Sequence, residues 1–409
     1  MNDQFGPSAA ESLGDGSRRA EAARLAASSD LPSRKSEEWR YSRIRRLDVS
    51  SLAPSLARPA GVELPDPEGV TERAATITLI DGWVVDIAVE TGWADKGLSI
   101  TTENRPADIA GEATLFDHLH HAFSPETLVI STSTGLTVRP PIVIVSHQLS
   151  AGIATFPHIV VEAGDGSDLS VVEQQTSAAG FGLNVPVVEV GVGPAARVRY
   201  QTHQDLDLEQ WQLARSVSSV ASQATLSAGI AAFGARYARV RTDTRLAGRG
   251  STGNLSAAYY GDGEQIHDFR VFQHHDARDS RSDLLFKGAQ DDASGSVYTG
   301  LIHIHPDGAG ANAYQTNRNI KLSPDAWAWS VPNLEIENND VRCSHASTVS
   351  PVDEDQQFYL GSRGVPPVAA DRLIVAGFFD DVIRRLPVAA THEVVRRRIS
   401  DKLDRRNAS

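Results

Sequence analysis

From residue 75 onward, apolar and polar residues alternate with a period of two in many short segments, which are rich in β-branched residues and bounded by Gly, Asp or Asn. This pattern predicts β-strands with one buried face. About two hundred residues of short strands, with turn residues every 8–12 positions, fit a sandwich, a barrel or a β-solenoid, and the spacing does not choose among them. The predicted strands include residues 76–80, 127–132, 141–145, 158–162, 169–173, 185–189, 196–200, 216–220, 235–240 and 255–260.

Before the β region, the pattern is helical and then irregular. The Ala-rich residues 18–27 have high helix propensity, and residues 36–46 are compatible with a second short helix. The glycines of residues 1–20 predict a frayed arm, and the prolines of residues 50–75 predict a linker or a wrapped loop. Inside the β region, Glu112 to Phe123 is the segment with a helical pattern.

Helices are expected again after the β region. The motif Ser350-Pro351-x-Asp353 predicts a helix start, with serine as N-cap and proline at the first helical position. Gly364 ends this helix and Pro366-Pro367 opens the next one. A last helix begins near Pro387, and its apolar stripe consists of Val395, Ile399 and Leu403.

The 409 residues therefore divide into three predicted regions. Residues 1–75 form an N-terminal helical region and linker, residues 76–348 a β core, and residues 349–409 a C-terminal helical domain. The composition, with 41% hydrophobic and 22% charged residues, is that of a globular protein with a substantial core.

Charge and cysteine content narrow the classes of function. The net charge of −13 argues against a nucleic-acid-binding surface, which is usually basic. A single cysteine excludes an internal disulfide. The sequence has no apolar run of about 18 residues and no hydrophobic segment typical of a signal peptide, so we expect a cytoplasmic protein.

The only cysteine, Cys343, stands two positions before His345, where the strand pattern ends. Thiolate and imidazole are good ligands for iron, copper and zinc. In an extended backbone, both side chains point to the same face and could share one metal or one partner. A lone cysteine is also a common small residue of hydrophobic cores. The spacing alone leaves both interpretations open.

A second candidate is His303-Ile-His305, which places two imidazoles on one face of a strand. A His-x-His pair followed by a carboxylate is typical of cupins, a class of double-sheet β proteins that often bind metal. The residues that follow contain no Glu three or four positions on. A cupin-like, metal-dependent enzyme that uses His303 and His305 is therefore the alternative function. The sequence has neither a phosphate-binding P-loop nor a nucleophile elbow.

A series of spaced motifs runs from Gly300 to Leu373. They are Gly300-Leu-Ile-His-Ile-His-Pro, Ala313-Tyr-Gln-Thr-Asn-Arg-Asn319, Pro332-Asn-Leu-Glu-Ile336, Asp340-Val-Arg-Cys-Ser-His345 and Asp353-Glu-Asp-Gln-Gln-Phe-Tyr-Leu-Gly-Ser-Arg-Gly364, together with residues 31–41 near the N-terminus. With these motifs the chain resembles the SufB/SufD family, the scaffold subunits of the SUF iron–sulfur cluster assembly system. One cysteine, instead of the several of a B subunit, makes it similar to the D subunit, SufD. Ala346 replaces the glycine of the D-type string Cys-Ser-His-Gly-Ala-Thr, which matters if the position needs positive φ.

The resemblance implies a central right-handed parallel β-helix between helical terminal regions. It also implies a non-catalytic scaffold for a SufBCD-type complex, with a SufB-like paralogue and a SufC-like ATPase as partners. A reduced flavin is associated with the family complex, although the sequence shows no flavin motif. The terminal helices are expected to cap the solenoid and to dock the ATPase through Phe358, Tyr359, Leu373, Ile374 and Phe378.

The same resemblance implies that His345 is an iron ligand of the nascent cluster, with Cys343 as an auxiliary ligand. Iron–sulfur clusters usually have about four protein ligands, mainly thiolates. One cysteine cannot meet that number, so we expect a transient cluster shared with the partner subunit.

Overall fold

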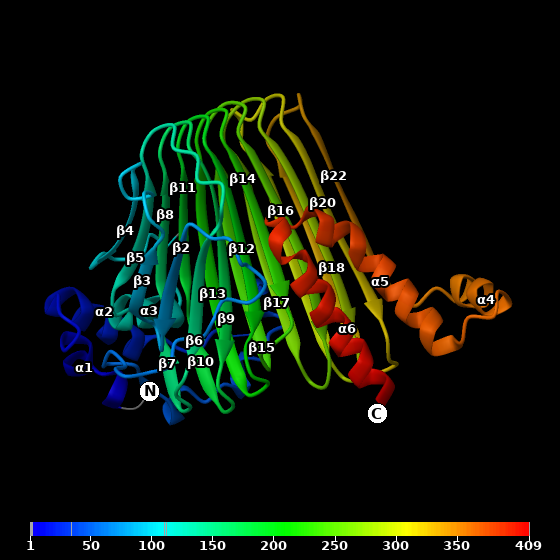
Figure 1. Cartoon of the computed structure of the whole chain (residues 1–409), viewed down its shortest axis with the longest axis horizontal. Helices are drawn as coiled ribbons and strands as arrows, with labels where there is room; N and C mark the ends of the chain where they lie inside the picture. The colour runs from blue at the N-terminus through cyan, green and yellow to red at the C-terminus, as the bar shows by residue number, and fades with distance from the viewer. Residues whose placement is uncertain (1–2, 34, 110, 112, 409) are drawn as a thin grey trace.

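The computed structural model describes residues 3–33, 35–109, 111 and 113–408. The chain forms a parallel β-solenoid of about eight turns, with helices at both termini (Figure 1). Successive strands alternate between two sheets, so each full turn adds one strand to each sheet. The predicted solenoid flanked by helices is confirmed, and the parallel strands exclude the antiparallel double sheet of a cupin.

The two sheets, A and B, enclose the core between them. Sheet A consists of β1 (Ala53–Pro54), β4 (Leu98–Glu103), β5 (Thr127–Thr132), β7 (Ile153–Thr155), β8 (His158–Ala163), β10 (Gly182–Asn184), β11 (Val187–Val192), β13 (Gln210–Val220), β15 (Tyr237–Leu246), β17 (Ile266–His275), β19 (Gly295–Ile304) and β21 (Trp327–Ile336). Sheet B consists of β2 (Ala75–Ile80), β3 (Trp83–Val89), β6 (Ile142–Gln148), β9 (Asp168–Ser177), β12 (Arg197–Asp205), β14 (Thr225–Ala232), β16 (Thr252–Gly261), β18 (Arg281–Gln290), β20 (Asn312–Lys321) and β22 (Arg342–Pro351).

The turns stack in register. Leu255 of β16 pairs with Leu284 of β18, and both side chains lie in the core. On the outside of sheet A, His274 of β17 pairs with His303 of β19, which pairs with Glu335 of β21. These three residues therefore stand in one column, although His274 precedes His303 by 29 positions and Glu335 follows it by 32. This stacking, and not the local sequence, decides which side chains meet.

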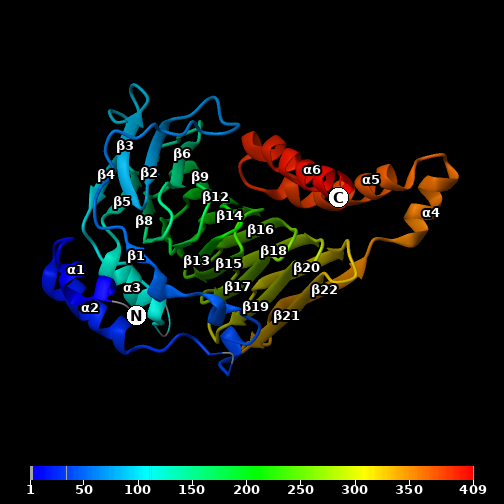
Figure 2. The same ribbon diagram turned by 90° about the horizontal axis from the view of Figure 1, so that it is seen from below.

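The N-terminal region packs against the first turns (Figure 2). Helices α1 (Pro7–Glu11) and α2 (Gly16–Ser28) lie beside α3 (Leu115–Phe123). Phe5 is 1% exposed and meets the ring of Phe123 edge-on. The prediction of a frayed arm is therefore wrong for residues 3–20, because burial of Phe5 holds them in place; residues 1–2 lie outside the described range.

Two other N-terminal predictions need correction. Residues 36–46 form no α-helix, and the chain makes two short 3-10 turns there, η2 (Glu37–Trp39) and η3 (Ile44–Arg46). Trp39 is buried beneath the guanidinium of Arg239, so tertiary packing overrides the local propensity. Helix α3 begins after Thr114, which forms a capping box with Asp117, whereas the predicted start at Glu112 lies outside the described residues. The remaining 3-10 turns are η1 (Asp3–Phe5), η4 (Val49–Ser51) and η5 (Ala389–Thr391).

The C-terminal helices follow the last strand. The prediction that Ser350-Pro351 starts a helix is wrong, because β22 runs to Pro351 and Asp353 caps α4 (Glu354–Ser362) by accepting two backbone N–H bonds. Helices α5 (Pro367–Arg385) and α6 (His392–Ala408) lie across the outer face of sheet B (Figure 1). The predicted stripe on the last helix is confirmed, since all three of its residues are buried there: Val395, Ile399 and Leu403.

Candidate functional site at the open end of the solenoid

Strand β22 carries Cys343 and His345 at the end of the solenoid. It pairs in parallel with β20, where Ala313 stands opposite Cys343 and Gln315 opposite His345. Ala313 and Gln315 point into the core and are at most 1% exposed. Because paired residues of stacked strands face the same side, Cys343 and His345 extend the same inward column. They occupy its last position, and no further turn lies over them among the described residues.

The Cys343 thiol is half-buried. It packs against the apolar core of the last turns, as Leu334 and Val341 also do, and burial raises its pKa to about 11. The thiol is therefore protonated at neutral pH in the isolated chain. Iron binding would displace this proton, since the thiolate is the form that ligates metal.

His345 differs from its neighbour in exposure. The imidazole faces solvent, and within the described part of the chain no hydrogen bond or ion pair holds it. Ala346, next to it, is an ordinary strand residue paired with Thr316 and does not have positive φ. The substitution of glycine by alanine therefore leaves the local geometry undisturbed.

Within the described residues, no further turn of the solenoid covers its last two strands. Strands β21 and β22 are the terminal strands of their sheets, and all their side chains are exposed or only half-buried. Large apolar side chains are partly exposed there, with exposed fractions of 44% for Ile336, 40% for Val349 and 51% for Trp329, whose ring stacks on Tyr41. Exposed edge strands with apolar side chains are typical of a surface that pairs with another chain.

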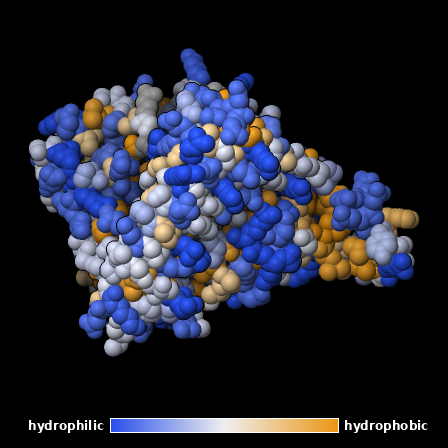
Figure 3. Space-filling view, turned by 90° about the horizontal axis from the view of Figure 1, so that it is seen from above, coloured by the Kyte–Doolittle hydropathy of each residue, from blue (hydrophilic) through white to orange (hydrophobic). Residues whose placement is uncertain are grey.

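The C-terminal helices present a second exposed surface, and the predicted docking residues are divided between it and the core. Phe358 is 80% exposed, and Tyr359 and Leu373 are each 56% exposed. Ile374 and Phe378 are half-buried against the apolar cluster between α5, α6 and sheet B. Helix α4 has no buried residue and projects beyond the solenoid (Figure 1). Hydrophobic surface gathers at this end of the molecule (Figure 3).

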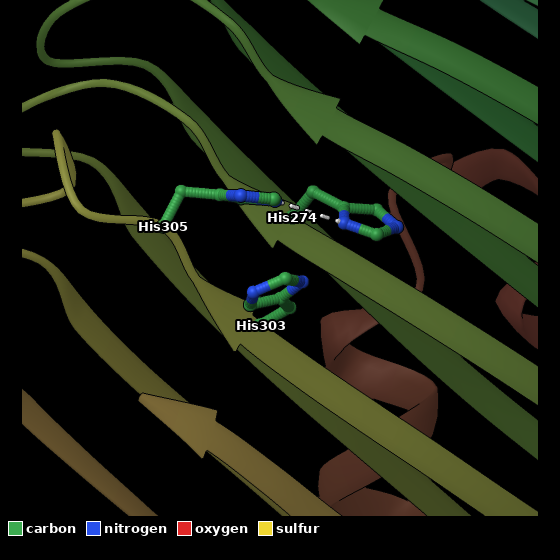
Figure 4. A group of neighbouring side chains, drawn as sticks. All are labelled: His274, His303 and His305. Carbon is green, nitrogen blue, oxygen red and sulfur yellow. Dashed lines mark hydrogen bonds between the residues drawn. The ribbon is translucent and has the colours of Figure 1, made fainter. Parts of the chain in front are cut away.

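The histidine pair of β19 belongs to a larger group. His303 and His305 lie beside His274 of β17, and one ring nitrogen from each lies within 4.8 Å of the others (Figure 4). Burial lowers the pKa of His274, which favours the neutral imidazole. His303 donates a hydrogen bond to the Glu337 carboxylate at 2.6 Å, so this carboxylate comes from the next turn instead of from the few residues after His305. The sequence places His267, His274 and His275 in the same β region, and the pairing of His274 with His303 is what singles out His274. Glu337 follows the last residue of β21, and no sequence pattern predicted that it joins this group.

Residues 145–378 match the family model described as "SUF system FeS cluster assembly, SufBD core domain". The chain belongs to this family. It is 25% identical to the iron–sulfur cluster assembly protein SufD of Escherichia coli over 91% of the chain and 89% of that protein. An iron–sulfur cluster assembly SufBD family protein of Mycobacterium tuberculosis is 28% identical over 92% of the chain and 90% of its own length. In the described part of the chain, no helix is long and apolar enough to span a bilayer.

Proposed function

We propose that this chain is the D-type scaffold subunit of a SUF complex, in which it joins a SufB-like paralogue and a SufC-like ATPase to assemble and transfer iron–sulfur clusters. The observation that carries this proposal is the inward column that ends on Cys343 and His345 without a covering turn. A second solenoid placed end to end would supply that turn and bury both side chains at the junction.

The ligand count supports a shared cluster. Cys343 and His345 provide one sulfur and one imidazole on the same side of β22, which is half of the usual set of about four ligands. His345 is the favoured iron ligand because its imidazole is accessible, whereas the thiol is half-buried and protonated. The cluster is the product that the complex assembles and passes on, and this chain holds part of its site without catalysing a reaction.

The projecting helix supports an ATPase partner. An isolated nine-residue helix is marginal in water, so α4, which buries none of its residues, gains little from its own chain. Tyr359 lines a groove of about 840 Å³ between β20, β22, α4 and α5, and Phe358, the residue before it, is 80% exposed. A partner that fills this groove would bury the Tyr359 ring, and one that also covers α4 would bury Phe358.

The test is co-expression with a SufB-like and a SufC-like partner, followed by anaerobic purification and measurement of iron and acid-labile sulfide. The complex with wild-type chain should carry clusters. His345→Ala should give the same complex with much less iron and sulfide, because no hydrogen bond or ion pair to another described residue holds this exposed side chain in the isolated chain. His118→Ala, which removes a partly exposed imidazole from α3 at the other end of the solenoid, is the matched control. Wild-type cluster content in the His345→Ala complex would refute the ligand role.

A further inference from the structure

The outer face of sheet A carries a histidine cluster that cluster assembly at the open end does not use. Its members are His274 near the end of β17, His303 near the end of β19 and His305 just after β19. All three side chains are half-buried, and they belong to two consecutive turns of the solenoid. Cys343 and His345 lie on the inward side of sheet B, at the open end of the solenoid, so the two groups are separate.

The spacing of the rings fits one small cation. Nδ1 of His274 and Nε2 of His305 face each other at 3.3 Å (Figure 4). Two imidazole nitrogens bound to one tetrahedral zinc ion, each at about 2.0–2.1 Å, lie roughly 3.3 Å apart. The rings of His303 and His305 have their centroids 3.8 Å apart, which brings the third imidazole to the same point.

Carboxylates surround the three imidazoles. Asp276 places its Oδ1 atom 3.2 Å from Nε2 of His305. This oxygen is buried and accepts no well-directed hydrogen bond from the described residues, while the other oxygen pairs with Arg245. A buried carboxylate oxygen without a donor costs free energy unless a cation or proton approaches it. Asp276 can therefore provide a fourth ligand.

Glu337 provides the support that a histidine ligand needs. It accepts a 2.6 Å hydrogen bond from Nε2 of His303, which leaves Nδ1 of that ring free for a metal. Metal-bound histidines usually donate their second ring N–H to a carboxylate, which fixes the tautomer and the ring orientation. Glu335 lies 4.0 Å from Nδ1 of the same ring and adds negative charge beside the cluster.

We propose that His274, His303 and His305, with Asp276, form a mononuclear site for a divalent transition-metal ion of the zinc class. Three imidazoles and one carboxylate match the ligand preference and the coordination number of Zn²⁺. The ion joins β17 to β19 on the outside of the solenoid and takes no part in the cluster site. This site does not rest on the proposed scaffold function.

The experiment uses the isolated full chain, stripped with a chelator and titrated with Zn²⁺ by calorimetry under nitrogen. We expect one equivalent to bind and the midpoint of thermal unfolding to rise, because an ion that binds the folded state stabilises it. Co²⁺ should give the intense visible absorption of a tetrahedral site. His303→Ala should abolish the stoichiometric step, and Glu337→Gln should weaken it by about tenfold to a hundredfold.

Two control variants show whether Zn²⁺ binds at the histidine cluster. The double variant Cys343→Ser/His345→Ala keeps the triad and should bind Zn²⁺ like wild type, which separates this site from the open end. Glu337→Gln alters an exposed side chain, so its weaker binding cannot be ascribed to misfolding if its unfolding midpoint without metal matches wild type. The proposal is overturned by the absence of a saturable step in wild type, or by an unchanged step in His303→Ala.

Discussion

His345 and Gln315 stand at paired positions of β22 and β20, yet Gln315 is 1% exposed while His345 faces solvent. The difference arises because the last turn of the solenoid covers Gln315, whereas no strand in the described part of the chain stacks beyond His345. Gln315 accepts a hydrogen bond from Tyr298 and donates one to the Asn333 carbonyl. At the same position of the column, Gln315 therefore holds the core together, whereas His345 in the next turn is available to bind a ligand.

The first prediction follows from this pair. His345→Ala should change the free energy of unfolding of the isolated chain by less than about 0.5 kcal/mol, as is usual for surface positions. Gln315→Ala should cost about 1–3 kcal/mol, because it leaves the buried Tyr298 hydroxyl and the Asn333 carbonyl without this hydrogen-bond partner. Urea unfolding followed by circular dichroism measures both. An equal loss of stability in the two variants would make His345 a structural residue.

The second prediction concerns the free edge of β22. The backbone N–H of Arg342 donates to the Ala311 carbonyl, so it points toward β20. Along a strand, successive N–H groups point to opposite sides, so the N–H of Ser347, five residues later, points away from β20. Ser347→Pro should therefore remove a donor from the open edge and weaken pairing with the SufB-like partner. The isolated chain should keep its fold.

Thr348→Pro is the matched comparison, because that amide faces β20 and its loss breaks a bond within the sheet. We expect this variant to lower the unfolding midpoint of the isolated chain. Pull-down of the tagged partner together with thermal unfolding distinguishes the two effects. Normal partner binding by Ser347→Pro would place the interface elsewhere.

The third prediction separates docking from core packing in the C-terminal helices. Replacing Phe358 and Tyr359 together by serine should abolish capture of the SufC-like ATPase and leave the stability of the chain nearly unchanged, since both rings are exposed. Phe379→Ala is the contrasting change, because this ring is fully buried between α5 and sheet B. It should cost about 3–5 kcal/mol. Size-exclusion chromatography of the mixed proteins, with unfolding curves for each variant, tests both expectations.

Point variants test ATPase docking more clearly than truncation of the C-terminal helices does. Helices α5 and α6 cover apolar residues of sheet B, including Leu285 and Ile320. Removal of all the C-terminal helices would expose that surface and confuse loss of docking with loss of folding. If the Phe358 and Tyr359 variant still binds the ATPase, the docking surface must lie outside α4.

How far the sequence predicts the structure depends on the distance over which residues interact. Strand positions such as 127–132 follow from local alternation, and the stripe through Val395 and Ile399 follows from helical periodicity. Predictions from local patterns were wrong where packing between residues distant in the sequence determines the conformation. Phe5 reads as part of a glycine-rich arm, and only its contact with Phe123 orders it.

The candidate sites divide in the same way. Cys343 and His345 are visible in the sequence because their spacing of two already places them on one face of a strand. The partners of His303 are not visible, because the length of each turn brings His274 from 29 residues before it and Glu337 from the turn after it. The uncovered state of the open end depends on where the last strand stops stacking, which no local pattern encodes.

The last prediction concerns acid stability and His267 on β17. This imidazole is 1% exposed. Burial and, to a smaller extent, the Lys402 ammonium together lower its pKa to about 3, against the opposing effects of a backbone hydrogen bond at Gly234 and of the Asp262 carboxylate. In the unfolded chain a histidine has a pKa of about 6.5. Between these two values the unfolded state binds more protons than the folded state, so stability falls as the pH is lowered from about 6.5 towards 3. His267 contributes at most one proton, or about 1.4 kcal/mol per pH unit, to this slope.

His267→Phe removes the titrating group and keeps an aromatic ring between Tyr259 and Phe269. The variant should show a shallower dependence of unfolding free energy on pH below 6.5 than wild type, whatever its stability at neutral pH. Urea unfolding at a series of pH values measures the slopes directly. Parallel curves for the two proteins across this window would mean that His267 is protonated in the folded state, which its position inside the solenoid, beside the Lys402 ammonium, argues against.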